Sequence, residues 1–429
     1  MTELTLTGTM DASDFKYVAE SFPQLASLDL SGVVVTEYSD KTPLFANFTL
    51  YPANVLPKYS FMGTSLETVV LPSSITEVGE GAFCGCAKLQ QVAIPASVTK
   101  IEKYAFSGAS ALASVSGGEG VTEIADYAFS RDTLLTSVAA MPELTSIGAY
   151  AFYGDKRLAS YKFKSNIQTI GECAFDHTAL TAVDLSGSTQ LDVVGAWAFA
   201  DNSSLTTVSL PKQVTAIGDG AFFYSTALKQ VVLPEAMVRI NDYAFMGANE
   251  VETAVLPEGV TVIGDYAFSD WTSMQQFLLP SSVESVGTRA MRNWTALTAL
   301  TSEAVTPPSL GEAVWEGVNV DNVTLTVPDA SEMAYKSADQ WKEFFNSAVE
   351  SVTNDNDFRI ITEGDRITVR SSQAISLAQL FDISGILLQS ATPAATETSF
   401  SLAGYSAKVY AVRCKLADGK EKIVKISRK

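Results

Sequence analysis

The segments AFFYSTALKQVVLP (221–234) and AFSDWTSMQQFLLP (267–280) decide the fold, because both are copies of one pattern that fills most of the chain. Each copy begins with an Ala-Phe pair and ends with an apolar run closed by proline. The aromatic position recurs every 22 to 24 residues, at Phe61, Phe83, Phe106, Phe129, Phe152, Phe175, Phe199, Phe222, Phe245 and Phe268, and Met291 and Trp315 continue the series. A period of this length predicts stacked units that bury their apolar faces against one another.

The apolar run of each repeat alternates as a half-buried β-strand does. In LQQVAIP (89–95), this alternation sends Val92 and Ile94 inward and Ala93 outward. Pro95 then ends the strand, because it lacks the N–H that a further ladder bond requires. The Ala-Phe pair is expected to begin a helical or 3₁₀ turn. We therefore predict an α/β solenoid, a right-handed leucine-rich repeat array of about eleven to twelve rungs.

A column of glycines lies three residues before the Ala-Phe pairs. Glycine that exchanges only with asparagine is typical of a left-handed backbone conformation. We therefore predict left-handed turns at Gly79, Gly148, Gly171, Gly195, Gly218, Gly264 and Gly287, and at Asn241, which replaces glycine once. The Phe column is predicted to stack in the core.

The combined pattern, I-G-x-x-A-F followed by L-x-x-V-x-L-P-x-x-V, resembles the BspA-like leucine-rich repeat family of bacterial surface proteins. The resemblance covers roughly residues 50 to 350. It implies a curved solenoid used for attachment or recognition at a cell surface, and it supplies no catalytic residue.

Four segments are expected along the chain. They are an N-terminal cap with the first rung (1–50), the repeats (51–326), a helical C-terminal cap (327–353) and a β-sandwich module (354–429). Asp11 or Ser13 is predicted to cap a helix from about Asp14 to Phe22. The apolar side of the C-terminal cap is predicted to consist of Tyr335, Trp341, Phe344 and Phe345.

The last segment alternates as antiparallel strands do, with turn signals between the strands. Its stretches LFDISGILLQS (380–390) and KVYAVRCKLADGKEKIVKI (408–426) resemble the C-terminal sorting domain of type IX secretion in Bacteroidetes. This second resemblance implies export and surface anchorage. A generic terminal β-module without an export function is the alternative.

Charge and composition exclude several classes of partner. The formal net charge of −19 argues against binding to nucleic acid or to an anionic membrane. No apolar run approaches the roughly 20 residues that a transmembrane helix needs. We interpret the four cysteines as free thiols, since their spacing is not that of a disulfide framework. No leader peptide is recognisable. We expect that a leader has been trimmed from this chain and that the protein is located outside the cell or on its surface. We also expect a monomer.

The search for catalytic chemistry is negative. His177 is the one histidine, and we interpret it as a surface-loop residue, not as a ligand or base. Zinc-site, catalytic-triad and phosphate-loop patterns are not recognisable. We therefore predict a protein that is not an enzyme and needs no cofactor. An acidic column, Asp126, Glu172, Asp219, Asp242 and Asp265, is either a solvated edge or a Ca²⁺ site.

The outward strand positions give the best candidate for binding. They are apolar on three consecutive repeats, at Val232, Val255 and Leu278, which we call the apolar stripe. Polar neighbours, Gln230, Thr253 and Gln276, accompany it, and an apolar patch with a polar rim is typical of a protein-contact surface. Trp271 and Trp294 join the candidate site, although they also fit as filling of the repeat loop. The stripe is alternatively covered by the C-terminal module or by a second copy of the chain.

A column of aromatic residues offers a different site. Its members, Tyr104, Tyr127, Tyr150, Trp197, Tyr243 and Tyr266, either stack on one another or present flat faces to a sugar. The favoured function is non-enzymatic recognition of a protein, such as a host extracellular-matrix protein, in adhesion. The alternatives are a polysaccharide-binding module that uses the aromatic column and a structural spacer.

Overall fold

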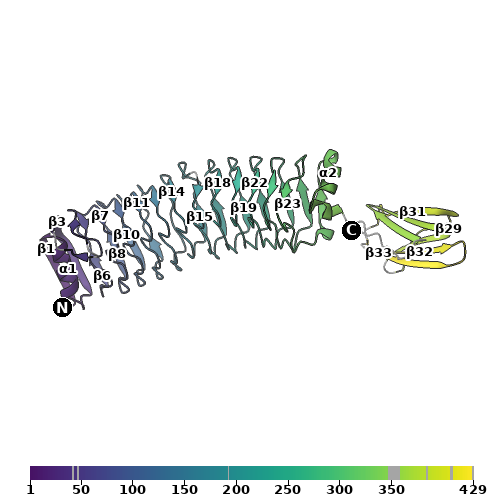
Figure 1. Cartoon of the computed structure of the whole chain (residues 1–429). Helices are drawn as coiled ribbons and strands as arrows, with labels where there is room; N and C mark the ends of the chain where they lie inside the picture. Colours follow the sequence, from purple (N-terminus) through teal and green to yellow (C-terminus); the bar gives the residue numbers. More distant parts are fainter. Residues whose placement is uncertain are drawn as a thin grey trace. The chain divides into compact units, whose positions relative to one another are not determined.

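The computed structural model describes residues 1–40, 43–45, 48–191, 193–345, 358–382, 385–405 and 409–427. The chain divides into two compact units, Met1–Val318 with Leu325–Ser331, and Asn319–Thr324 with Glu332–Lys429. Figure 1 shows the first unit as a stack of rungs that follow one another in sequence order. The predicted boundary between residues 353 and 354 lies outside the described residues.

Most rungs of the first unit contribute two β-segments, one to each face, but the fully described rung between β13 (Ser146–Ile147) and β14 (Thr169–Ile170) has no strand on the second face. One face is a continuous parallel sheet of twelve short strands. These are β5 (Val55–Leu56), β7 (Glu77–Val78), β9 (Lys100–Ile101), β11 (Glu123–Ile124), β13 (Ser146–Ile147), β14 (Thr169–Ile170), β16 (Val193–Val194), β18 (Ala216–Ile217), β20 (Arg239–Ile240), β22 (Val262–Ile263), β24 (Ser285–Val286) and β26 (Ser309–Leu310). The stacked-repeat solenoid is thereby confirmed.

The other face is divided into several parallel sheets. The first contains β1 (Glu3–Met10), β2 (Ser27–Val35), β6 (Thr68–Val70), β8 (Gln91–Ile94), β10 (Ser114–Gly117) and β12 (Ser137–Val138). Three smaller sheets follow, β15 (Ala182–Asp184) with β17 (Thr207–Ser209), β19 (Gln230–Val232) with β21 (Thr253–Val255), and β23 (Gln276–Leu279) with β25 (Ala299–Ser302) and β27 (Thr324–Thr326). A short hairpin of β3 (Tyr38–Ser39) and β4 (Leu50–Tyr51) lies near the N-terminus.

The predicted strand alternation is confirmed. Val92 and Ile94 are each 2% exposed, whereas Ala93 between them is exposed to solvent. The first helix, α1 (Ala12–Ser21), is preceded by Asp11, whose carboxylate accepts a hydrogen bond from the Ser13 N–H at 2.8 Å. Asp11 is therefore the cap, and Ser13 lies inside the helix.

The Ala-Phe segment forms turns and does not begin a helix. Phe83 N donates to Ala105 O of the next rung at 2.7 Å, while Cys84 N donates back to Gly81 O at 3.0 Å. Alternate residues therefore bond between rungs and within the turn. The Phe rings stack in the core as predicted, with 5.3 Å between the centroids of Phe83 and Phe106.

The glycine column is not left-handed, so this prediction is wrong. None of the seven glycines has a positive φ. An ideal Cβ on Gly287 would instead lie 2.5 Å from Asp265 N, and one on Gly264 would lie 2.6 Å from Asp242 N. Glycine is needed because the backbone of the preceding rung passes too close for a side chain. The left-handed positions lie two residues later and include Tyr104, Tyr127, Tyr150, Trp197, Tyr243 and Tyr266.

The second unit contains short helices and an antiparallel module. The helical part comprises η2 (Val320–Asn322), α2 (Glu332–Ser337) and η4 (Trp341–Phe345), and η3 (Asp329–Ser331) precedes α2. Tyr335, Trp341 and Phe344 are buried as predicted, and Phe345 is half-buried.

The module consists of β28 (Phe358–Glu363), β29 (Arg366–Asp382), β30 (Leu387–Ala391), β31 (Ala395–Ser401), β32 (Val409–Leu416) and β33 (Glu421–Ser427). All its pairs are antiparallel, as predicted. The 17-residue β29 pairs with β28, β30, β31 and β32, so the strands form one curled sheet in which β29 belongs to both halves. Its core contains Ile367, Val369, Leu380 and Val412.

We predict that Gly287→Ala destabilises the solenoid by about 1–3 kcal/mol, because the new Cβ collides with the backbone of the preceding rung. Gly187→Ala is the matched control, since an ideal Cβ there meets no atom within 4 Å. The midpoint of urea unfolding, followed by circular dichroism, measures both changes. An unchanged midpoint for Gly287→Ala would contradict the close-approach explanation.

Candidate functional site

The apolar stripe lies on the divided face of the solenoid. Val232, Val255 and Leu278 are 52%, 60% and 43% exposed, and Gln230, Thr253 and Gln276 are exposed beside them. The β19–β21 register pairs Val232 with Val255 and Gln230 with Thr253, so the apolar and the polar residues form separate rows. Val70 is also exposed, but the outward residues of the next two strands, Ala93 and Ser116, are small. The stripe is therefore a run of large apolar side chains on three consecutive repeats.

Two hollows adjoin the stripe where the sheet is interrupted. One of about 560 Å³ is lined by residues of β21, β23 and β25, including Thr253, Gln276 and Leu278. The other, of about 330 Å³, is lined by residues around β17 and β19, including Ser209 and Val232. The apolar stripe is therefore bordered by two hollows, which a flat sheet face would not have.

Trp271 and Trp294 do not belong to this surface. Both are fully buried, and their rings stack with 5.8 Å between centroids. Trp271 Nε1 donates to Phe245 O at 2.9 Å and Trp294 Nε1 donates to Phe268 O at 2.7 Å. The two side chains fill the rung interior, so they are not available to a partner.

The aromatic column is stacked along much of its length. Ring centroids are 5.0 Å apart for Tyr104 and Tyr127, 4.8 Å for Tyr127 and Tyr150, and 5.2 Å for Tyr243 and Tyr266. The ring faces shared within these stacks are covered by the neighbouring ring, and the side chains are half-buried. Trp197 lies in the same column, 6.1 Å from Tyr243. Stacking favours a structural role, because sugar binding uses open ring faces.

The acidic column bonds one rung to the next. Asp242 Oδ1 accepts from Asp265 N at 2.9 Å, and Asp265 Oδ1 accepts from Thr288 N at 2.7 Å. Asp126 does the same with Ala149 N at 2.9 Å. These carboxylates therefore satisfy backbone N–H groups of the following rung. The described residues of this column do not form a metal-ligating group, so the Ca²⁺ alternative has no geometric support.

A column whose burial the sequence analysis did not predict lies three residues after each Phe and after Met291. Its members include Cys86, Asp132, Asp155, Thr178, Asn202, Ser225, Trp271 and Trp294, all buried. Several donate to the carbonyl of the preceding rung's Phe, as Cys86 Sγ does to Phe61 O at 2.9 Å and Asn202 Nδ2 does to Phe175 O at 2.8 Å. Aligning the repeats on Phe would have placed all of them, including both tryptophans, in one inward column.

Asp132 and Asp155 place two carboxyl groups in this column. Both are fully buried, and Asp132 N donates to Asp155 Oδ1 at 2.8 Å. Both carboxyl oxygens of Asp132 and the Oδ2 of Asp155 have no hydrogen-bond partner. Burial raises the pKa of Asp132 well above its usual range, and the neighbouring Asp155 raises it further. Burial likewise raises the pKa of Asp155.

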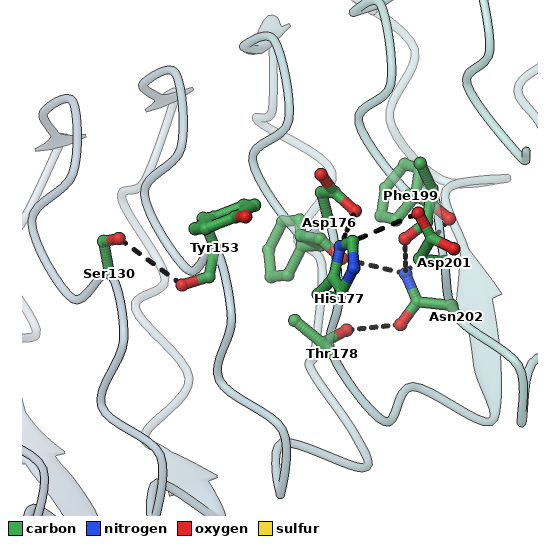
Figure 2. A network of polar contacts seen from close by, with 10 residues as sticks. Ser130, Tyr153, Asp176, His177, Thr178, Phe199, Asp201 and Asn202 are labelled. Atoms are coloured by element: carbon green, nitrogen blue, oxygen red, sulfur yellow. Dashed lines mark hydrogen bonds and ion pairs between the residues drawn. The ribbon is translucent and has the colours of Figure 1, made fainter.

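A second missed feature joins His177 to two carboxylates (Figure 2). His177 Nδ1 lies 2.6 Å from Asp176 Oδ1 and 3.7 Å from Asp201 Oδ2. One ligand atom from each of the three residues lies within 4.8 Å of the other two. The interpretation of His177 as an isolated loop residue did not foresee these neighbours, because Asp201 belongs to the next repeat.

All four cysteines are free, as interpreted, and Cys84 is the one that is not buried. Burial raises the pKa of the Cys173 thiol to about 11 and that of Cys414 to about 12. Among the described residues, no helix combines the length and the apolar character that crossing a membrane requires.

Comparison with known protein families matches the BspA type leucine rich repeat region at residues 54–181, 124–252, 192–317 and 238–362. These matches span well over half of the chain. The chain belongs to the BspA-type leucine-rich repeat family. No curated protein matches the chain.

Solved structures of other bacterial repeat proteins are similar to this BspA-type chain. A leucine-rich repeat protein from Bacteroides ovatus is 22% identical, with a TM-score of 0.42, over 61% of this chain and 68% of its own. A leucine rich cell surface protein from Faecalibacterium prausnitzii is 20% identical, with a TM-score of 0.43, over 70% and 89%. The pneumococcal vaccine antigen PcpA is 20% identical, with a TM-score of 0.41, over 60% and 75%.

For this BspA-type protein, we predict that Asp132→Asn stabilises the fold at pH 7 by about 1–3 kcal/mol. Because burial raises the pKa of folded Asp132 above the ordinary aspartate value of 3.8, the folded carboxyl holds a proton that the unfolded carboxyl releases. Stability therefore falls as pH rises above that value, and the amide removes this loss. Urea unfolding at pH 7 and near pH 4 measures the effect, which should shrink at the lower pH.

The reciprocal change supplies the control. Asn202→Asp places a carboxyl where an amide donates to Phe175 O, so it should destabilise the fold more at pH 7 than near pH 4. Destabilisation of the fold by Asp132→Asn at pH 7 would contradict the explanation.

Proposed function

We propose that this protein is a non-enzymatic recognition protein of the bacterial cell surface that binds a protein partner through the apolar stripe. The observation that carries the proposal is the exposure of Val232, Val255 and Leu278 on consecutive repeats. Isolated apolar side chains on a surface need no explanation, but a contiguous row of them is costly unless it is covered in a complex.

The surroundings of the stripe support a protein partner more than a sugar. Amide and hydroxyl side chains, Gln230, Thr253 and Gln276, form an exposed polar row beside it. An apolar centre with a polar rim is the composition of protein interfaces. The adjacent hollow of about 560 Å³ offers room for a partner's side chain beside Leu278. A host extracellular-matrix protein is a partner of this kind.

Recognition of a polysaccharide by the aromatic column is the alternative. The stacking of Tyr127 on Tyr150 and of Tyr243 on Tyr266 weakens it, because their shared faces are not free for a sugar. A structural spacer needs neither site, and it gives the exposed stripe no role.

We predict that Val232→Asp, Val255→Asp and Leu278→Asp together weaken binding to the protein partner by about tenfold or more. An array of extracellular-matrix proteins and polysaccharides, probed with the purified chain at moderate and high salt, identifies the partner and measures the change. Burial of apolar surface should make the binding resistant to salt.

The matched controls are Ala93→Asp with Ser116→Asp, which add charge at outward positions of β8 and β10 on the same face. These should leave binding unchanged, and thermal melts of all variants should match the parent. Undiminished binding by the stripe variant would exclude this site. Loss of binding in Tyr243→Leu with Tyr266→Leu, with the stripe intact, would favour the aromatic column.

We further propose that the antiparallel module directs export and anchorage, as the resemblance of residues 380–390 and 408–426 to type IX sorting domains implies. Residues 354–429 fused to a secreted reporter should bring that reporter to the surface of a Bacteroidetes strain with this pathway. The same fusion in a strain that lacks the pathway is the control. A reporter retained inside both strains would contradict the export role.

A further inference from the structure

The Asp176–His177–Asp201 cluster occupies an unusual place in the repeat. The residue two positions after the Phe is glycine with positive φ in several rungs, namely Gly63, Gly85, Gly108, Gly154, Gly247 and Gly317. His177 and Asp201 occupy this place on two adjacent rungs, with φ of 57° and 51°. The solenoid therefore stacks an imidazole and a carboxylate on each other, and Asp176 adds a second carboxylate from the His177 rung.

From this geometry we propose that Asp176, His177 and Asp201 bind a divalent transition-metal ion, with Zn²⁺ as the best-fitting species. Zinc accepts imidazole nitrogen and carboxylate oxygen at about 2.0–2.2 Å, which puts neighbouring ligand atoms of a tetrahedral site about 3.3 Å apart. The distances from His177 Nδ1 to the two carboxylate oxygens, 2.6 Å and 3.7 Å, lie on either side of that separation. Small side-chain rotations bring both to it.

The donor set selects the class of metal. Calcium and magnesium prefer all-oxygen sites, whereas a mixed nitrogen and oxygen set suits zinc and its first-row neighbours. Two carboxylates and a neutral imidazole also balance the charge of a divalent ion. The cluster therefore differs from the acidic column, whose carboxylates accept backbone N–H groups.

The surrounding contacts hold the three ligands in place. Asn202, which is fully buried, donates to Phe175 O at 2.8 Å and to Ala200 O at 3.2 Å, and so ties together the backbones beside Asp176 and Asp201. Thr178 Oγ1 donates to Asn202 Oδ1. As Figure 2 shows, these contacts lie directly beside the cluster. Rigid support of this kind lowers the cost of gathering ligands around an ion.

The side facing solvent leaves room for the remaining coordination. A hollow of about 410 Å³ is lined by His177 together with Tyr153, Thr133, Gly154, Arg131 and Lys156. The Tyr153 ring packs against the imidazole, with 5.8 Å between centroids. Water reaches His177 through this hollow and supplies the ligands that three protein residues leave open. Asp176, by contrast, is buried, which makes it the fixed wall of the site.

The test uses the untagged full chain and zinc chloride. Because His177 is the only histidine, ring-¹³C-labelled histidine gives a single set of resonances that reports this site alone. A 1:1 shift of the His177 signal on titration with Zn²⁺ is expected, together with a rise in thermal midpoint that grows with zinc concentration. Calcium and magnesium at the same concentrations should cause neither change.

Matched variants separate the site from adventitious binding. His177→Asn and Asp201→Asn keep side chains that tolerate the left-handed conformation, and each should lower zinc affinity measured by calorimetry by more than about tenfold. Asp270→Asn is the control, because Asp270 occupies the same place in another rung with a φ of 67° and should bind no zinc. An unmoved His177 signal up to millimolar zinc, or equal affinity in Asp201→Asn and the parent, would overturn the proposal.

Discussion

The bonding of each rung to the next is the constraint on which the structure depends. Backbone hydrogen bonds join adjacent rungs along the continuous sheet, within each sheet of the divided face, and in the turn segment, where Phe83 N donates to Ala105 O. Because the rungs are stacked in this way, each side chain lies next to the side chain at the same repeat position in the neighbouring rung. An inward position is therefore filled by residues that stack, as Phe106 does on Phe129 with 5.2 Å between ring centroids.

The same constraint explains why some columns tolerate variation and others do not. At Gly218 or Gly264 the backbone of the preceding rung leaves no space for a Cβ, so only glycine fits at these positions. Three residues after Phe the interior accepts many different side chains, and some of them, such as Asn202 and Trp271, satisfy the carbonyl of the preceding rung. Outward strand positions such as Val232 need neither a small side chain nor a hydrogen-bond donor, so substitutions there do not affect the core. Recognition evolves most easily at these positions.

Left-handed tyrosines illustrate how stacking offsets local strain. A non-glycine residue in this conformation costs about 1–2 kcal/mol. Stacked pairs such as Tyr127 and Tyr150, 4.8 Å apart, return about 0.5–1.5 kcal/mol each in addition to the burial of their rings. The aromatic column is therefore explained as part of the solenoid framework, without a bound ligand.

The periodicity predicted the solenoid, the Phe stack and the strand alternation, because these depend only on spacing and apolarity. It could not predict why the glycines are there, since glycine serves both a left-handed turn and a close approach. It placed Trp271 with the surface candidates because large aromatics suit interfaces as well as cores. His177 and Asp201 are neighbours because each stands two residues after the Phe of its own repeat, Phe175 and Phe199. Aligning the columns on Phe would have revealed both pairs.

The central claim is that recognition uses the divided β-face around β19, β21 and β23. Hydrogen–deuterium exchange of the chain with its bound partner, read by mass spectrometry, tests it most directly. The account predicts slower exchange in peptides that cover residues 228–234, 251–257 and 274–280, and unchanged exchange elsewhere. Protection confined to residues 104–150, along the aromatic column, or to residues 358–427 of the antiparallel module would contradict it.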